Sequence, residues 1–138
     1  MSASRDRLNR TPLHYAVVDK SLPEMHRLLD AGLDPSAADK AGWTPLHFAA
    51  QACFAEAASL LIERGAVVDA QDAHGNTPLS RAVFSSMGHG EVIRILRDSG
   101  ADPNLKNHSG ISPLALARTI ANYDVRQFFS DLPEEPAV

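Results

Sequence analysis

Apolar residues recur along the chain at the spacing of short amphipathic helices. Met25, Leu28 and Leu29 fall on one helical face, with polar residues among them. Similar apolar clusters return at 57–62 and 92–96. Each cluster is followed by a glycine, the usual left-handed residue just beyond a helix, at Gly32, Gly65 and Gly100. The pattern therefore predicts three helices of similar length, each ended by a glycine.

A second kind of helix start recurs along the chain, and its first three copies each precede one of these clusters. Ser or Thr followed by Pro-Leu begins at positions 11, 44, 77 and 112, at spacings of 33, 33 and 35 residues. The hydroxyl can cap a helix N-terminus, and proline at the first helical position loses no hydrogen bond. A fixed period of this length is typical of stacked repeats, which usually present a binding surface. The four copies are Thr11-Pro12-Leu13-His14, Thr44-Pro45-Leu46-His47, Thr77-Pro78-Leu79-Ser80 and Ser112-Pro113-Leu114-Ala115.

A turn is predicted before each copy. An acidic or amide residue stands five positions before the hydroxyl residue, and a glycine stands two before it, in the last three units. Glycine accepts positive φ, and Asp or Asn bonds its own backbone, so this pair favours a tight turn. In the first unit Asn9 replaces the glycine, and Asn tolerates the left-handed conformation better than most residues. The pairs are Asp39 with Gly42, Asp72 with Gly75 and Asn107 with Gly110.

The second helices of the first and last units have features of their own. Ser21-Leu22-Pro23-Glu24 predicts a capping box at the start of the first. In the last unit Val125, Phe128 and Phe129 predict a second helix, but no closing glycine follows. We therefore expect a lead-in with a partial finger at 1–10, a repeat domain at 11–130, and an acidic, proline-containing tail at 131–138 that frays. The expected repeats are 11–43, 44–76, 77–111 and 112–130.

The recurring turn, Thr-Pro-Leu-His, helix pair and Gly-Ala-Asp together resemble the ankyrin repeat, over residues 6 to about 130. Gly88-His89 and Gly100-Ala101-Asp102-Pro103-Asn104 are further family signatures in the third unit. The resemblance implies an all-α solenoid, a stack of helix-turn-helix pairs joined by β-hairpin-like fingers at right angles. It also implies binding of folded proteins through the fingertips and the first helices, which line the concave side, without enzymatic activity in the repeat.

The chain departs from the family pattern at several positions. Ser80 and Ala115 replace the motif histidine, while Lys20 and Cys53 stand where the family has glycine between helices. The third unit also has two extra residues near 85–87. These departures put local hydrogen bonding in question, not the fold.

Composition and charge narrow the function. The net charge of −4 argues against nucleic acid, which normally selects a basic face. The single cysteine, Cys53, excludes an internal disulfide and suits a reducing compartment. No segment resembles a signal peptide or approaches the roughly 20 apolar residues of a membrane span. We expect a cytoplasmic chain that binds neither membrane nor nucleic acid.

The resemblance places candidate protein contacts on the fingers and first helices. Trp43, the only tryptophan, stands between the turn and the helix start; it is either a binding anchor or packed against a neighbouring finger. One aromatic anchor with polar groups and charges of both signs suits a protein partner. The candidates are Arg7, Arg10, Lys40, Trp43, His74, Asn76, His108 and Ile111 on the fingers, and Asp19, Gln51, Phe84 and Ser85 on the first helices.

The sequence gives little support for catalysis or for the binding of a metal ion or cofactor. The family implies a structural role for His14 and His47, whose rings bond within and between repeats. No histidine pair has zinc-ligand spacing, no glycine-rich phosphate loop is present, and Cys53 with His47 lacks a third orienting group. We expect no catalytic residue, metal or cofactor, although a cryptic hydrolase using Cys53 or histidines remains a remote alternative.

Three roles remain open for a protein-binding chain. It is a stand-alone interaction module, an immunity-type inhibitor of a cognate toxin or enzyme, or a fragment of a larger scaffold. The mild acidity of the chain would suit a basic, nucleic-acid-cleaving target. We expect a monomer when no partner is bound.

Overall fold

The predicted helix starts are confirmed in all four units. The computed structural model of the protein describes residues 6–120 and 124–133. The first helix of each unit begins directly after the expected Ser or Thr, and the extended backbone of that residue leaves its side chain free to cap. Proline occupies the first helical position each time. These helices are α1 (Pro12–Val18), α3 (Pro45–Gln51), α5 (Pro78–Ser85) and α7 (Pro113–Thr119).

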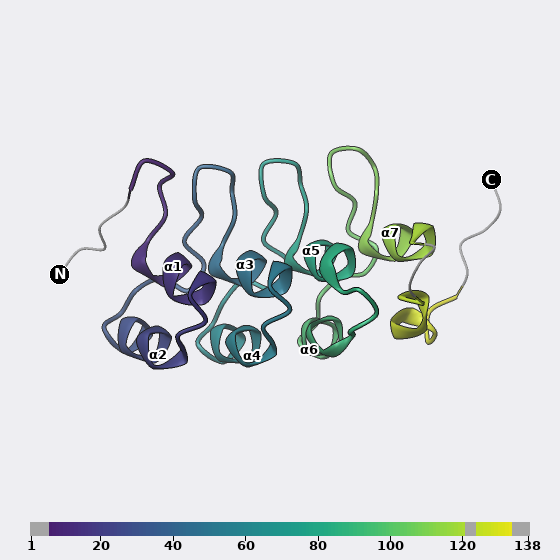
Figure 1. Cartoon of the computed structure of the whole chain (residues 1–138). Helices are drawn as coiled ribbons and strands as arrows, with labels where there is room; N and C mark the ends of the chain where they lie inside the picture. The colour runs from purple at the N-terminus through teal and green to yellow at the C-terminus, as the bar shows by residue number, and fades with distance from the viewer. Residues whose placement is uncertain (1–5, 121–123, 134–138) are drawn as a thin grey trace.

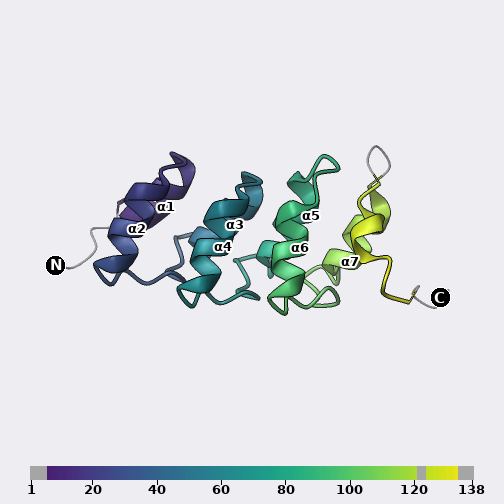
Figure 2. The same cartoon turned by 90° about the horizontal axis from the view of Figure 1, so that it is seen from below.

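The second helices form a separate layer beneath the first (Figure 1). They are α2 (Leu22–Asp30), α4 (Ala55–Glu63) and α6 (Glu91–Asp98), and the chain returns antiparallel within each pair. The pairs follow one another along a single direction, with the α1–α2 pair and α7 at opposite ends of the row (Figure 2). The all-α solenoid that the resemblance implies is thus confirmed for the described residues.

The fourth pair is incomplete. Its second member is a single 3₁₀ turn, η1 (Arg126–Phe129), where an α-helix was expected. Side-chain contacts with the preceding unit hold this turn. Arg97 donates to the Phe128 carbonyl at 2.9 Å and pairs with both carboxylate oxygens of Asp131 at 2.6 and 2.9 Å. The expected tail therefore begins with a residue that contacts α6, while 134–138 lie outside the described residues.

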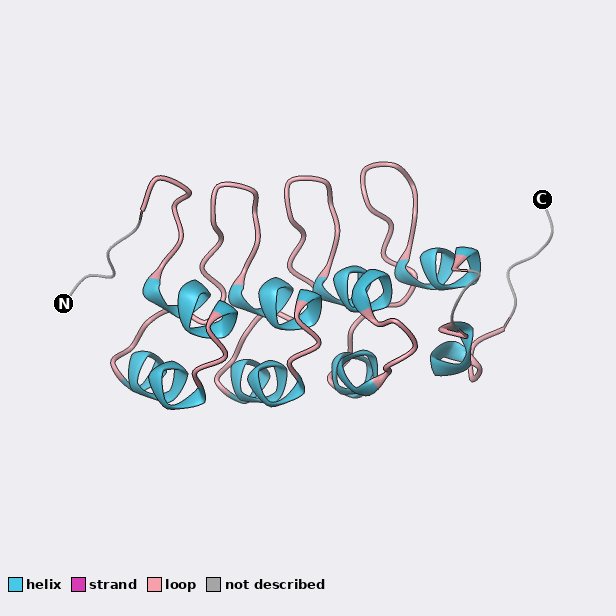
Figure 3. Cartoon of the chain, viewed as in Figure 1, coloured by secondary structure: helices cyan, strands magenta, loops and turns pink. Residues whose placement is uncertain are grey.

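The fingers are drawn as loops in Figure 3, and within residues 6–120 and 124–133 none contains a β-strand. They are nevertheless closed like hairpins. In the second finger the Asp39 N–H donates to the Trp43 carbonyl at 2.8 Å, and the Asp39 carboxylate accepts from the Ala41 and Trp43 N–H groups. Backbone bonds from Lys40 to Leu8, Ala73 to Ala41 and His108 to His74 join neighbouring fingers at 2.8–2.9 Å.

The core lies between the two helix layers and continues through the stack. The motif leucines Leu13, Leu46 and Leu79 are fully buried, as are Met25 and Leu61 from the second helices. Small residues of the first helices, such as Ala49 and Ala50, are also fully buried, which lets neighbouring pairs approach closely. Burial of apolar surface therefore drives the stacking of units.

The departures from the family pattern keep the expected backbone. Lys20 and Cys53 adopt φ of 55° and 53°, and Asn9 adopts 61°, so each takes the left-handed conformation that glycine has elsewhere. Ser21 Oγ accepts from the Glu24 N–H at 3.4 Å, while the Glu24 carboxylate pairs with Arg27. The predicted capping box is therefore present as the serine half alone. The closing glycines are left-handed as predicted, with φ of 91° at Gly32, 92° at Gly65 and 94° at Gly100.

Within 6–120 and 124–133, no helix combines the length and the apolar character that crossing a bilayer requires.

Candidate protein-binding surface

The motif histidines fix the fingers against the first helices. His47 Nδ1 accepts from the Thr44 N–H at 3.1 Å, and its Nε2 donates to the Asn76 carbonyl of the next finger at 2.9 Å. His14 repeats this arrangement with the Thr11 N–H at 3.0 Å and the Trp43 carbonyl at 2.9 Å. The structural role that the family implies for both rings is therefore what the geometry shows.

The bonding of His47 requires the neutral ring. Protonation at Nδ1 would remove the acceptor that the Thr44 N–H uses. Burial lowers the pKa of His47, and the nearby Arg81 lowers it further, while the Asn76 carbonyl and the Asp72 carboxylate act in the opposite direction. The neutral His47 ring therefore joins the start of α3 to the following finger.

Four aromatic rings and two guanidinium groups form a row of successive contacts along the first helices and the adjoining flank of the fingers. We call this surface the finger–helix face. Its aromatic–arginine row consists of Tyr15, Arg10, Phe48, Trp43, Arg81 and Phe84.

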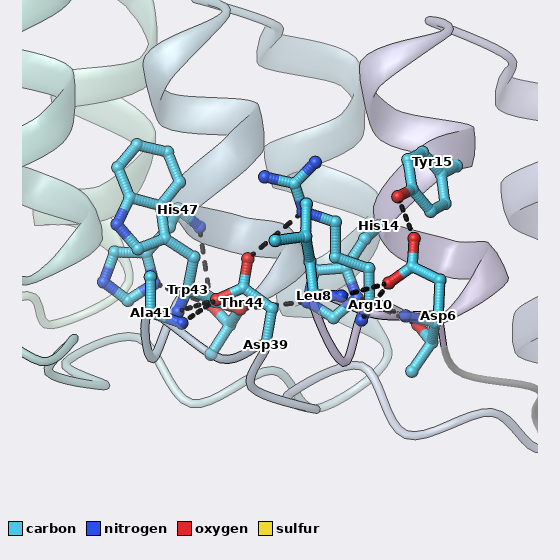
Figure 4. A network of polar contacts seen from close by, with 11 residues as sticks. Asp6, Leu8, Arg10, His14, Tyr15, Asp39, Ala41, Trp43, Thr44 and His47 are labelled. Atoms are coloured by element: carbon cyan, nitrogen blue, oxygen red, sulfur yellow. Dashed lines mark hydrogen bonds and ion pairs between the residues drawn. The ribbon is translucent and has the colours of Figure 1, made fainter.

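The first half of the row centres on Arg10. Its Cζ lies 5.8 Å from the centre of the Tyr15 ring and 5.0 Å from that of Phe48. Its Nε is 3.4 Å from Oδ2 of the buried Asp39, whose other oxygen holds the second finger (Figure 4). Arg10 is therefore held by one charge partner and two ring faces.

A polar clasp lies at the N-terminal end of the row. The Tyr15 hydroxyl donates to the Asp6 carboxylate, which also accepts from the Leu8 and Arg10 N–H groups at 3.0 Å (Figure 4). The Tyr15 hydrogen bond lowers the pKa of Asp6, and the carboxylate in turn raises the pKa of Tyr15. The first finger is thereby tied to α1.

The second half of the row centres on Trp43 and Arg81. The Trp43 ring stacks on His47 at 5.8 Å and meets Phe48 edge-on at 5.0 Å. Arg81 Cζ lies 5.6 Å from the Trp43 ring centre and 5.3 Å from that of Phe84. The Trp43 ring is half-buried, and it contacts side chains of α3 and α5.

Several apolar side chains on this face remain open to solvent. Phe84 is 61% exposed and Ile111 is 42% exposed, against 36% for Tyr15. Met87, in the loop made by the two extra residues, is 65% exposed and has φ of 47°. Exposed apolar groups beside half-buried rings are a feature of protein interfaces.

The twelve candidates fall into three groups. Six are exposed side chains with no part in the row: Arg7, Lys40, His74 and His108 at fingertips, Asp19 after α1 and Gln51 at the end of α3. Arg10, Trp43 and Phe84 belong to the row, with Ile111 exposed at the equivalent place on the last finger. The other two have structural contacts: Asn76 accepts from the Asn107 amide at 2.9 Å, and the Ser85 carbonyl accepts from Cys53 Sγ at 3.2 Å.

Sequence reasoning missed three members of the row. Tyr15, Phe48 and Arg81 follow directly after the fourth motif position in units one, two and three. A comparison of the residue that follows the motif in each repeat would have shown two aromatic residues and an arginine in register. That signal was available, but the contacts of Arg10 and Trp43 with these side chains depend on the neighbouring finger.

Charges are divided unequally between the two layers. The fingers, first helices and following turns (6–21, 39–54, 72–90, 106–120) hold seven Lys and Arg against four Asp and Glu. The second helices and following loops (22–38, 55–71, 91–105, 124–133) hold five against eleven. The acidity of the chain therefore belongs to the second-helix layer, and the finger–helix face lies on the basic one.

In the part of the chain that the structure describes, Cys53 and His47 do not form the catalytic pair considered from the sequence. Both ring nitrogens of His47 are engaged in the fold, so it offers no base to Cys53. Partial burial raises the pKa of the Cys53 thiol, which disfavours the reactive thiolate. Across the described ranges, no three His, Cys, Asp or Glu side chains are grouped to hold a metal ion.

Comparison with known proteins gives one finding on the family. The family model described as ankyrin repeats (3 copies) matches residues 13–107, more than half of the chain. A sequence search of curated proteins returns no match.

Proposed function

Because the chain belongs to the ankyrin-repeat family, we propose that it is a non-catalytic module that binds another protein through its finger–helix face. Ankyrin repeats are in general protein–protein interaction modules. The observation that carries the proposal is the aromatic–arginine row with the exposed Phe84 at its end. Aromatic and arginine side chains are the types enriched where interfaces derive most of their binding energy.

Rigidity supports the same role. His14 and His47 join the first helices α1 and α3 to the fingers that follow them, and Arg10 is fixed by Asp39 and two rings. A surface that is held in place before binding loses little conformational entropy when a partner docks. Of the twelve candidate residues, Arg10, Trp43 and Phe84 then form part of the central row, and the six exposed polar candidates form its rim.

The inhibitor role remains a narrower prediction within this proposal. A basic target would be attracted most by the second-helix layer, because that layer carries the excess of acidic residues. The finger–helix face, on the basic layer, suits the opposite charge. A monomeric state and a reducing, cytoplasmic location are parts of the proposal that rest on the repeat architecture and on the single cysteine.

A photo-cross-linking residue at position 84 tests the proposal directly. Phe84 is 61% exposed on α5, and Val67, 55% exposed in the loop after α4, is a matched apolar position on the other layer. We expect discrete cross-linked protein products from position 84 that excess unmodified chain suppresses. The same pattern from position 67, or no specific product from 84, would count against the proposal.

A further inference from the structure

We infer that Arg81 receives a carboxylate from the partner, so that the finger–helix face is built for an acidic protein segment. The inference rests on the proposed function and adds the chemistry of what binds. It starts from a guanidinium that the fold positions but does not neutralise.

Arg81 differs from the arginines that the fold uses. Arg10 pairs with Asp39, Arg64 with Asp30 and Arg97 with Asp131. Within 6–120 and 124–133, Arg81 makes no ion pair, and its buried Nε has no hydrogen-bond partner. The rest of the guanidinium carries a positive charge that no carboxylate of the described residues offsets, and an ionised acceptor can form strong hydrogen bonds with it.

The surroundings of Arg81 favour a carboxylate in particular. The Trp43 and Phe84 rings flank the guanidinium at 5.6 and 5.3 Å and orient its planar group. A carboxylate can accept two parallel N–H bonds from such a fork, and docking over the rings excludes water from the pair. Phe84, more than half exposed, then contacts an apolar neighbour of the acidic residue.

The charge distribution points the same way. The layer that carries Arg81 has seven basic and four acidic residues, and two of those acidic residues, Asp39 and Asp72, are buried and hold the finger turns. The second-helix layer, with eleven acidic residues, repels an acidic segment. The electrostatic field of the chain therefore guides such a segment to the finger–helix face.

A single-stranded nucleic acid is an alternative anionic ligand, because its planar bases could stack on the aromatic rings of the row. Binding by base stacking needs open ring faces along a continuous basic path. One face of the Trp43 ring is stacked on His47, and Phe48 meets the ring edge-on, so base stacking on Trp43 is restricted. An acidic peptide segment, which needs one carboxylate at Arg81 and one apolar contact at Phe84, suits this geometry better.

The test screens a displayed library of random 12-residue peptides for ligands of the intact chain. Peptides that lose binding to Phe84→Ser are kept, and each acidic peptide is compared with its Glu→Gln or Asp→Asn twin by fluorescence anisotropy. We expect the amide twin to bind the unmodified chain about tenfold more weakly, as for a close charge pair. On Arg81→Gln the two twins should bind within about twofold of each other.

Two further variants separate charge at this position from charge in general. Arg27→Gln removes one exposed arginine of α2 and should keep the full tenfold difference between the twins. Arg81→Lys keeps the charge without the fork and should keep part of it. Thermal unfolding of each variant checks that the fold is intact.

Each contrary outcome has a distinct meaning. Phe84-dependent peptides without a required acidic residue would overturn the carboxylate inference and leave the proposed function standing. A tenfold difference that persists on Arg81→Gln would do the same. An absence of any Phe84-dependent peptide would contradict both, and Arg81-dependent binding of a 12-nucleotide oligothymidine in preference to every peptide would replace the protein segment by nucleic acid.

Discussion

At the scale of single residues, the same few positions serve both the fold and the candidate surface. His47 supports the ring of Trp43 while its nitrogens join two fingers. Trp43 is therefore a poor probe of binding, because its truncation disturbs the packing on α3. Phe84, exposed and on a helix whose core side is separate, is the better probe.

Replacing His47 by Leu should destabilise the protein by about 2–4 kcal/mol. The change leaves the Thr44 N–H and the Asn76 carbonyl without their partner, at about 1–3 kcal/mol for each buried group. Urea unfolding monitored by circular dichroism measures the loss. His26→Leu, at an exposed position on α2, is the control and should stay within about 0.5 kcal/mol of the unmodified chain.

His47 should also make stability depend on pH. Burial lowers its pKa in the folded chain, while in the unfolded chain the pKa is about 6.5. The unfolded state then binds the proton more readily, so stability is complete above about pH 6.5 and falls as the pH drops below it. Urea midpoints between pH 7.5 and 5.5 should decrease less in His47→Gln, and equal slopes in both proteins would show that another group is responsible.

At the scale of elements, the helix starts could be predicted from the sequence more fully than the form of the last element. Ser or Thr before Pro marks an N-terminus by local chemistry alone, and all four such starts occur where expected. The last unit was harder, because its 3₁₀ turn is held by Arg97 and Asp131, and such a distant contact leaves no local pattern. Only half of the aromatic–arginine row could be predicted, for the same reason. Arg10 of the first unit contacts Phe48 of the second, and this contact depends on the stacking of units.

The fingers show how close approach adds to local geometry. Gly42 and Gly110 have nearly the same φ, 81° and 80°, but a Cβ on Gly42 would lie 2.7 Å from the Ala73 nitrogen, whereas one on Gly110 would meet nothing within 4 Å. Gly110→Ala should therefore cost about 1–2 kcal/mol, from the left-handed conformation alone. Gly42→Ala should cost clearly more.

Thermal and urea unfolding of the two alanine variants measure this difference. Equal losses would mean that the second and third fingers separate easily to admit the methyl group. A larger loss in Gly42→Ala would show that the fingers act as one packed row.

At the scale of the whole molecule, the stack separates its tasks by layer. The second helices carry the acidic excess, and the first helices with the fingers carry the row and the basic excess. The core between the layers continues from Leu13 to Leu114, so each unit relies on its neighbours for burial. The exposed side chains of the finger–helix face, such as Phe84, therefore lie outside this core.

The affinity of the partner captured at position 84, measured by calorimetry with matched variants, tests the central claim most directly. We predict that Phe84→Ser weakens binding by about 2 kcal/mol, about thirtyfold, while Val67→Ser leaves the Kd unchanged. Equal affinities for the two variants, or a loss confined to Val67→Ser, would contradict the assignment of binding to the finger–helix face.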